Sequence, residues 1–451
     1  MKQESKFTQG PILGPLIRFA LPVLLALFLQ AMYGAVDLMV VGQFATAADV
    51  SAVATGSQIM YTMMVVITGL SMGLTVLVGR KIGEGKGREA GSIIAGGIWL
   101  FGMLTILLSV AIFLLAPGLA KLMHAPEEAF SRTVSYVRIC SCGTIFIVSY
   151  NLLGSIFRGI GDSKMPLIAV AIACVLNILG DLLLIAGFKM GAAGAALATA
   201  FAQAVSVVLS LLIIRRRQLP FTFRVREIRF DRGVIGSILQ LGIPIALQDL
   251  LVNISFMVLL SIINGLGLIA SAGVGVAEKL CAFVMLVPSA YMQAMSAFVA
   301  QNMGAEKPER ARKALLYGIL SSLSVSVILF WLSFFHGDLL ARIFAREEAV
   351  ILAAADYLRA YAIDCLLTSF LFCFIGYFNG CGHTVFVMIQ GLLGAFGVRI
   401  PVSFVMSRLA EVSLFRIGLA TPCATVLQIT MCMVYFTLVL RRQKRLTTLQ
   451  K

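Results

Sequence analysis

The stretch Val78–Ala90, VGRKIGEGKGREA, decides the architecture because it has a gapless counterpart 221 residues later, Val299–Ala311, VAQNMGAEKPERA. The same shift places the Phe-x-Gly-x-Gly motif of residues 157–161 on residues 378–382, and Pro22 pairs with Pro244 within one residue of it. These matches include polar residues between apolar segments, so they exceed the general likeness of one apolar helix to another. The sequence therefore predicts two fused copies of one structural unit.

The composition indicates a membrane protein. Of the 451 residues, 60% are apolar and 13% are charged, whereas soluble proteins carry about 25% charged residues. A helix needs about 20 apolar residues to cross a bilayer, because every backbone polar group must be satisfied within the segment. Twelve stretches qualify, which predicts an all-α integral membrane protein with transmembrane helices at residues 15–41, 50–78, 93–115, 133–154, 165–185, 192–214, 236–262, 272–299, 315–335, 356–376, 385–406 and 413–440.

Lys and Arg accumulate in the loops on one side of these spans. The two termini and the even-numbered loops hold 24 of them, and the odd-numbered loops hold 6. Positive residues gather on the cytoplasmic side of membrane proteins. We therefore expect a multi-pass protein of a bacterial-type cytoplasmic (plasma) membrane, with both termini in the cytoplasm.

The longest of the inner loops divides the spans six and six. Residues 215–232 contain seven arginines with apolar residues between them, a pattern typical of a segment that rests on an anionic leaflet. The excess of 36 Lys and Arg over 21 Asp and Glu also fits nucleic-acid binding, but its position in short loops between spans argues against a nucleic-acid partner. We predict an N-terminal lobe of residues 1–214, a cytoplasmic basic linker of residues 215–233 and a C-terminal lobe of residues 234–451.

Each predicted half starts inside and has an even number of spans. The two six-helix lobes therefore share an orientation and are predicted to be related by a pseudo-twofold axis along the membrane normal. In transporters of this kind the solute passes between the lobes, which favours alternating access over a fixed pore.

Several motifs resemble the multidrug and toxic compound extrusion (MATE) family over nearly the whole chain. They are FALPVLLALFLQAMYGAVDLMVVG at residues 19–42, NILGDLLLI at 177–185, GAAGAALAT at 191–199, AQNMGAEKPERA at 300–311 and VRIP at 398–401. The resemblance implies two lobes around a central cleft, and a secondary active antiporter that exports amphipathic, cationic organic compounds in exchange for H+ or Na+. The expected partners are small organic cations or drugs and the lipid bilayer. We expect a monomer, and no cofactor beyond the coupling ion.

Acidic residues within predicted spans are candidate functional residues, because a carboxylate at the centre of a membrane helix costs about 2.5 to 3.5 kcal/mol on insertion scales. Asp37 and Asp181 are the two in the first half, Asn177 shares a helix face with Asp181, and Thr199 lies in the next span. The alternating directions of the spans place these residues in the outer half of the bilayer, where they can converge.

Two carboxylates, an amide oxygen and a hydroxyl form a hard-oxygen set that suits a small cation. Poor solvation and like charge also suit a bound proton, so the residues leave Na+ and H+ open and indicate no other metal. The resemblance implies that Asp37, Asn177, Asp181 and Thr199 act as the cation-binding and coupling set. The alternative is that Asp37 or Asp181 only hydrogen-bonds to a neighbouring helix.

Pro22 removes a hydrogen bond from the first span, so we expect that span to bend there. Gln30, Tyr33 and Asp37 follow it on one helix face. We hypothesise that proton or Na+ binding at Asp37 changes the bend and remodels a substrate cavity, to which Gln30 and Tyr33 would contribute. A kink with a purely structural role is the alternative.

The second half repeats the scaffold but not these acids. The positions that match Asp37, Asn177 and Asp181 hold Leu259, Val398 and Val402. Acids occur at other positions, and the resemblance implies that such acids can contact a cation or the substrate; they are Asp249, Glu278 and Asp364. Glu278 could instead join Lys279 and Arg399 in a neutralising structural network.

Other functions fit the sequence less well. A flippase of lipid-linked cell-wall or oligosaccharide precursors shares a related scaffold and is the closest alternative, but such proteins usually have fourteen spans and basic cavities. An integral membrane enzyme would need a His-rich, Ser-His or di-acid motif in a cytoplasmic loop, and the sequence has none, so we expect no catalytic residues. A channel would not need a doubled lobe with an ion site in one half only.

Overall fold

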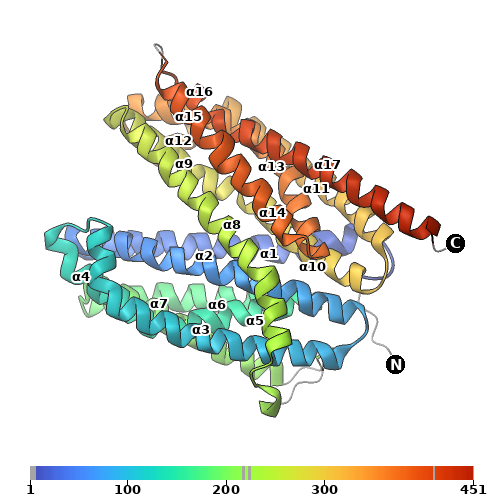
Figure 1. Cartoon of the computed structure of the whole chain (residues 1–451). Coiled ribbons are helices and arrows are strands. Elements are labelled where there is room, and N and C mark those ends of the chain that lie inside the picture. Colours follow the sequence, from blue (N-terminus) through green and yellow to red (C-terminus); the bar gives the residue numbers. More distant parts are fainter. Residues whose placement is uncertain (1–6, 216–218, 222–224, 410–411, 450–451) are drawn as a thin grey trace. The chain divides into compact units, whose positions relative to one another are not determined.

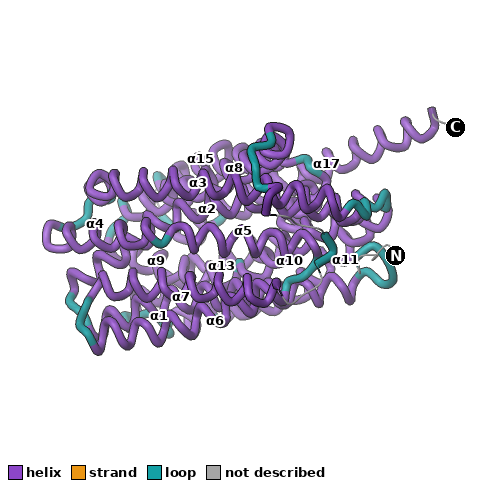
Figure 2. The backbone as a smooth tube through the Cα atoms, turned by 90° about the horizontal axis from the view of Figure 1, so that it is seen from below, coloured by secondary structure: helices purple, strands orange, loops and turns teal. Residues whose placement is uncertain are grey.

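The computed structural model describes residues 7–215, 219–221, 225–409 and 412–449. The described backbone is helical, with short loops and no strand (Figure 2). The helices of the first half are α1 (Leu13–Phe44), α2 (Ala47–Gly83), α3 (Gly87–Leu122), α4 (Glu127–Cys142), α5 (Thr144–Ile160), α6 (Lys164–Asp181), η1 (Leu182–Gly187) and α7 (Gly191–Arg215). Those that follow are η2 (Val225–Glu227), α8 (Arg232–Asn264), α9 (Leu268–Val284), α10 (Leu286–Gly304), α11 (Pro308–Phe335), α12 (Gly337–Ala341), α13 (Glu348–Cys381), α14 (Thr384–Leu392), η3 (Leu393–Arg399), α15 (Ile400–Ser407), α16 (Leu414–Gly418) and α17 (Ala420–Leu449).

The predicted all-α membrane architecture is confirmed. Among the described residues, eleven helical segments are long and apolar enough to cross a membrane, and the bent pair α4 and α5 makes twelve if it is counted as one span. This pair replaces the single helix predicted over residues 133–154, because the chain bends by 50° between Cys142 and Thr144. A Cβ on Gly143 would lie 2.8 Å from the Ala200 Cβ. The glycine at the bend therefore lets α7 approach closely.

The outer faces of the spans carry large apolar side chains. On α3, Ile106, Leu107, Val110 and Leu114 are each more than half exposed. Contiguous apolar faces are rare on soluble monomers, whereas lipid tails cover such a face in a bilayer. The exposed apolar side chains therefore fit a multi-pass membrane protein.

The helices pack as two units. Unit 1 comprises Met1–Ala246 and Ala300–Arg310, and unit 2 comprises Leu247–Val299 and Ala311–Lys451. In unit 1, α1 packs against α6, α6 against α7, and α2 against α3, α4 and α5 (Figure 1). In unit 2, the long helix α13 packs against α9, α16 and α17. The lobe and linker boundaries drawn from the sequence stay predictions.

The described part of the basic linker packs against α3. The rings of Trp99 and Phe230 meet edge to face with centroids 5.1 Å apart. A Cβ on Gly87 would lie 2.6 Å from the Pro220 carbonyl oxygen, so the linker backbone passes directly over the start of α3. Residues 216–218 and 222–224 of the predicted linker lie outside the described residues, and its contact with an anionic leaflet stays a prediction.

One arginine donates several hydrogen bonds to the N-terminal segment of unit 1. Arg310 donates hydrogen bonds from its guanidinium to the carbonyl oxygens of Phe7, Gln9, Gly10 and Pro11 at 2.6–3.1 Å. A guanidinium presents five donors in a fixed plane, which suits it to a turn of converging carbonyls. The segment before α1 is thereby held against the start of α11.

Residues of the internal repeat meet each other where α2 and α10 end. A Cβ on Gly83 would lie 2.0 Å from the Gln301 carbonyl oxygen, and a Cβ on Gly304 would lie 2.0 Å from the Arg80 carbonyl oxygen. Gly83 matches Gly304 and Arg80 matches Gln301 under the 221-residue shift. A glycine of each helix therefore lies against a backbone carbonyl of the other helix. Small residues commonly occupy such positions where membrane helices approach closely.

We expect Gly83→Ala to lower the free energy of unfolding by about 2 kcal/mol, because the new methyl group must displace a main-chain carbonyl. Gly102→Ala is the control, since a Cβ at this helical position would meet nothing within 4 Å. This control should be neutral or slightly stabilising. Thermal unfolding in detergent measures both variants, and equal melting temperatures would show that the crossing is not tight.

Candidate cation-binding site

Three helices of unit 1 bring the predicted cation ligands together. Asp37 lies on α1, Asn177 and Asp181 lie on α6, and Thr199 lies on α7. Asp37, Asn177 and Asp181 are 6%, 2% and 0% exposed. Asn177 and Asp181 are four residues apart and therefore face the same side of α6. The helix packing of unit 1 makes this side the meeting point of α1 and α7.

Hydrogen bonds connect three of the four side chains. The Thr199 hydroxyl donates to Asp37 Oδ2 at 3.3 Å and accepts from Asn177 Nδ2 at 3.4 Å. Asp181 lies one turn of α6 beyond Asn177, and both of its carboxylate oxygens lack a hydrogen-bond partner in the described chain. Two ionised carboxylates cannot donate to one another. A proton or another cation would supply what the Asp181 oxygens lack.

Several buried oxygens of this cluster have no donor among the described residues. They are Asp37 Oδ1, Asn177 Oδ1 and both carboxylate oxygens of Asp181. No described Lys or Arg forms an ion pair with Asp37 or Asp181. Buried polar atoms in native proteins are nearly always hydrogen-bonded, so such a group of acceptors calls for a specific explanation. A small cation would satisfy all of them at once.

The backbone changes its winding at the cluster. The α-helical hydrogen-bond pattern of α6 ends at Asp181, and η1 continues it as a π-helix over Leu182–Gly187. π-helical turns are rare and occur frequently at functional sites. The wider winding begins at the residue that follows Asp181 and thus determines how this carboxylate is presented.

The other residues predicted on α1 also lie in unit 1. Gln30 Nε2 donates to the Tyr150 hydroxyl at 3.4 Å, and Tyr33 lies one helical turn after Gln30 on α1. Pro22 lies inside α1, which is assigned as one helix from Leu13 to Phe44. The roles of Pro22 in bending and of Gln30 and Tyr33 in a substrate cavity stay predictions.

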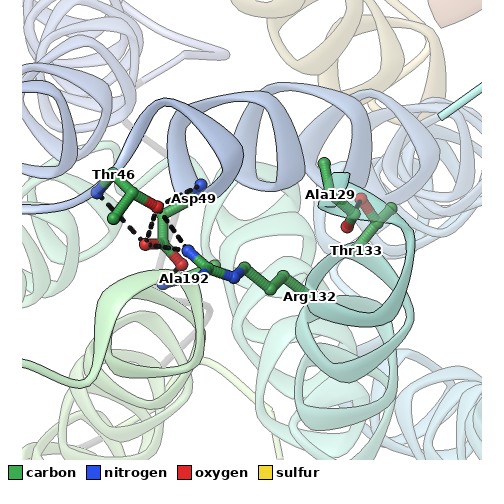
Figure 3. Close-up of polar contacts among 6 residues, drawn as sticks. All are labelled: Thr46, Asp49, Ala129, Arg132, Thr133 and Ala192. Carbon is green, nitrogen blue, oxygen red and sulfur yellow. Dashed lines mark hydrogen bonds and ion pairs between the residues drawn. The ribbon is translucent and has the colours of Figure 1, made fainter. Parts of the chain in front are cut away.

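The sequence analysis missed a polar clasp at one end of unit 1, formed by Thr46, Asp49, Arg132 and the main chain of Ala192 (Figure 3). Asp49 Oδ2 accepts from Thr46 Oγ1 at 2.7 Å and from Arg132 Nη1 at 2.5 Å. Asp49 Oδ1 accepts from the Ala192 main-chain nitrogen at 3.1 Å. The clasp joins the starts of α2, α4 and α7, and under the predicted orientation it lies on the outer side.

Two local features, a capping box and a glycine, show why the chain folds in this way at the clasp. Thr46 and Asp49 form a capping box, in which each side chain binds the main-chain nitrogen of the other. Gly191 has φ +55°, and a Cβ there would lie 2.5 Å from Asp49 Oδ1. Only the Thr-x-x-Asp spacing was visible in the sequence, because Arg132 and Ala192 lie far along the chain. The clasp fixes the start of α7, eight residues before Thr199.

The acids predicted in the second half differ from this cluster. Asp249, Glu278 and Asp364 lie on α8, α9 and α13. Asp364 is 2% exposed and accepts from Thr425 Oγ1 at 2.6 Å. No hydrogen bond or ion pair joins any two of the three acids in the described chain. No hydrogen bond or ion pair joins Glu278, Lys279 and Arg399 among the described residues, where Arg399 contacts Ser255 and Phe256. A neutralising network of the three residues stays a prediction.

Comparisons with known proteins agree with the repeat and with the fold. The MatE family model matches the chain twice, over residues 22–183 and 244–405. Probable multidrug resistance protein YpnP of Bacillus subtilis (strain 168) is 27% identical over 402 residues, covering 89% of this chain and 90% of that protein. Multidrug export protein MepA of Staphylococcus saprophyticus is 24% identical over 418 residues, covering 91% of each.

Two solved structures show the same fold. One is an outward-facing multidrug resistance MATE family transporter of the MOP superfamily, which superimposes with a TM-score of 0.90 over 99% of both chains at 19% identity. The other is a MOP superfamily transporter from Pyrococcus furiosus, described as having a binding pocket of reverse polarity, with a TM-score of 0.90 over 100% of both chains at 19% identity.

We expect Asp49→Ala to lower the free energy of unfolding by about 2 kcal/mol, because it removes a helix cap and leaves the Ala192 nitrogen without its partner. Glu128→Gln is the control, an exposed acid in the first turn of α4 that forms no ion pair with Arg132 in the described chain. Thermal unfolding in detergent compares the two variants. A melting temperature of Asp49→Ala that equals the control would mean that the clasp contributes nothing to stability.

Proposed function

Because this chain belongs to the MATE family of multidrug efflux transporters, we propose that it is a secondary active antiporter that exports amphipathic organic cations in exchange for H+ or Na+. The relatives named as multidrug proteins support this function over a lipid-precursor flippase. The fold shared with an outward-facing transporter supports alternating access as the mechanism.

The observation that carries the coupling proposal is the group of buried acceptors between α1, α6 and α7. Asp37 and Asp181 are both buried, and no described basic residue forms an ion pair with either. Two buried like charges at close range repel by a few kcal/mol. A proton or Na+ removes this repulsion, so the packing of α1 against α6 and α7 depends on whether a cation is bound.

This dependence supplies a coupling step. With a cation bound, Asp37 and Asp181 attract a shared charge. Thr199 then holds α7 to α1 through its bond to Asp37 and to α6 through its bond from Asn177. Once the cation leaves, the two carboxylates repel, and α1 separates from α6. A substrate that binds one of these two arrangements more tightly than the other shifts the equilibrium between them. Because the cation shifts the same equilibrium, substrate binding and cation binding are coupled.

We expect Asp37→Asn to abolish gradient-driven export, because the neutral amide cannot release or bind the coupling ion. In proteoliposomes, efflux of a fluorescent organic cation is measured under a pH gradient without Na+ and under a Na+ gradient at fixed pH. The wild type should respond to at least one gradient, and that response names the ion. Glu128→Gln should behave as the wild type does, and a response retained by Asp37→Asn would refute the coupling role.

Thr199→Val should weaken cation binding about tenfold, which corresponds to the loss of about 1.4 kcal/mol from two hydrogen bonds to the site. Thr199→Ser keeps the hydroxyl and should bind as the wild type does. The concentration of Na+ or H+ that gives half-maximal efflux measures the effect. Equal values for the valine and serine variants would exclude Thr199 from the site.

A further inference from the structure

The second copy of the internal repeat motif binds the main chain of residues 7–11, the N-terminal strap. Asn302 Nδ2 and Arg310 Nε donate to the Phe7 carbonyl oxygen at 3.2 and 2.9 Å. Lys307 Nζ donates to the next carbonyl oxygen at 2.9 Å, and the two Arg310 Nη atoms donate to the three after it. Each residue of the strap therefore has its carbonyl oxygen bound by one of these three side chains, the strap donors.

The Phe7 side chain anchors the strap. It is 5% exposed, and its ring meets the Phe19 ring edge to face with centroids 5.2 Å apart. A Cβ on Gly161 would lie 3.3 Å from the Phe7 ring and 3.2 Å from Gln301 Nε2. Gln301 Nε2 donates to the Gly159 carbonyl oxygen at 2.7 Å. The Phe7 ring is thus buried within unit 1, among the first turns of α1, the end of α5 and the end of α10.

The strap donors stand at positions that form an ion-pair network in the first copy of the motif. Under the 221-residue shift they match, in order, Lys81, Lys86 and Glu89. Both lysines pair with Glu84, and Lys81 also pairs with Glu89, at 2.7–3.1 Å. In the second copy an alanine matches Glu84 and Arg310 matches Glu89. The same loop therefore carries ion pairs in one copy and donors for a bound main chain in the other.

The strap is joined directly to α1. Ile12 alone separates it from Leu13, the first residue of that helix, and α1 also carries Asp37. At the other side of the contact, residues 300–310 belong to unit 1, whereas the chain before and after them belongs to unit 2. The strap therefore ties the helix of the candidate cation site to the connection between α10 and α11.

We propose that the strap donors form a docking surface for the N-terminal segment, and that the docked strap transmits a movement of α1 to the connection between α10 and α11. This rests on the proposed antiport function, from which it takes the cation-dependent position of α1. Hydrogen bonds to main-chain carbonyls are exchanged for bonds to water at a modest net cost. The strap can therefore undock when α1 moves and dock again when α1 returns.

Docking is measured with Thr8→Cys in the full-length protein. Thr8 is 7% exposed, so a thiol at this position reacts with a maleimide mainly while the strap is undocked. Mass spectrometry of the N-terminal peptide separates this thiol from the nine native cysteines. We expect the addition of Arg310→Gln to raise the labelling rate about tenfold, because four carbonyl oxygens lose a charged donor.

Lys313→Gln is the matched control. It removes a positive charge from an exposed position of α11, about one turn after Arg310, and should leave the labelling rate unchanged. Lys307→Gln removes a different strap donor and should raise the rate as Arg310→Gln does. This variant decides the question of docking if Arg310→Gln does not fold.

The same labelling rate tests whether docking follows the cation. It is compared in NaCl and in choline chloride at one pH, and at lower pH without Na+, each time relative to a free cysteine peptide in the same buffer. We expect the coupling ion to slow the labelling severalfold. Asp37→Asn should remove this dependence, because α1 then no longer responds to the cation.

Transport separates transmission from simple stabilisation. Phe7→Ala and Arg310→Gln should slow gradient-driven efflux in proteoliposomes about tenfold, the size of a typical coupling free energy. The cation concentration that gives half-maximal efflux should not change, because both variants keep all the candidate cation ligands. A strap with a purely structural role would lower the melting temperature of both variants and leave the efflux rate of the folded protein unchanged.

Two results would overturn the proposal. One is an equal labelling rate in folded Arg310→Gln, Lys307→Gln and Lys313→Gln proteins, since the strap would then not depend on its donors. The other is a labelling rate that ignores the ion to which wild-type efflux responds, since the strap would then be a static cap. Failure of the antiport proposal gives a different result, in which wild-type efflux responds to neither gradient while Arg310→Gln still labels faster than Lys313→Gln. That result removes the transmission step and supports the docking surface.

Discussion

The structure depends on a constraint at the contact of α1, α6 and α7. The carboxylates of Asp37 and Asp181 are buried at this contact, and three of their four oxygens lack donors in the described chain. A helix bundle can bury such groups only if a cation compensates them for at least part of the time. The stability of unit 1 and its proposed response to an ion therefore depend on the same contact.

Much of this contact could be predicted from the sequence. The free-energy cost of burying a carboxylate in lipid is high enough to make Asp37 and Asp181 candidate functional residues for that reason alone. The helical repeat placed Asn177 beside Asp181, and the alternation of span directions placed Thr199 at the same depth. The structure brings all four side chains together, as these arguments predicted, and their function as cation ligands stays a prediction.

Other features could not be predicted because they depend on contacts between distant residues. Arg132 meets Asp49 across 83 residues of sequence, and no local pattern marks the pair. The bend at Gly143 requires knowledge of Ala200 on another helix. The π-helix after Asp181 likewise has no signature in a uniformly apolar segment. In each case the deciding partner is chosen by packing rather than by sequence spacing.

The crossing of α2 and α10 has a consequence for the origin of the doubled chain. Gly83 lies against the Gln301 carbonyl, and Gly304 lies against the Arg80 carbonyl, so both helices present the same pair of groups. Contacts of this kind are isologous, as in a twofold homodimer, where one surface is complementary to itself. A half-length ancestor that carried this glycine and carbonyl could have paired with its own copy before the two genes fused.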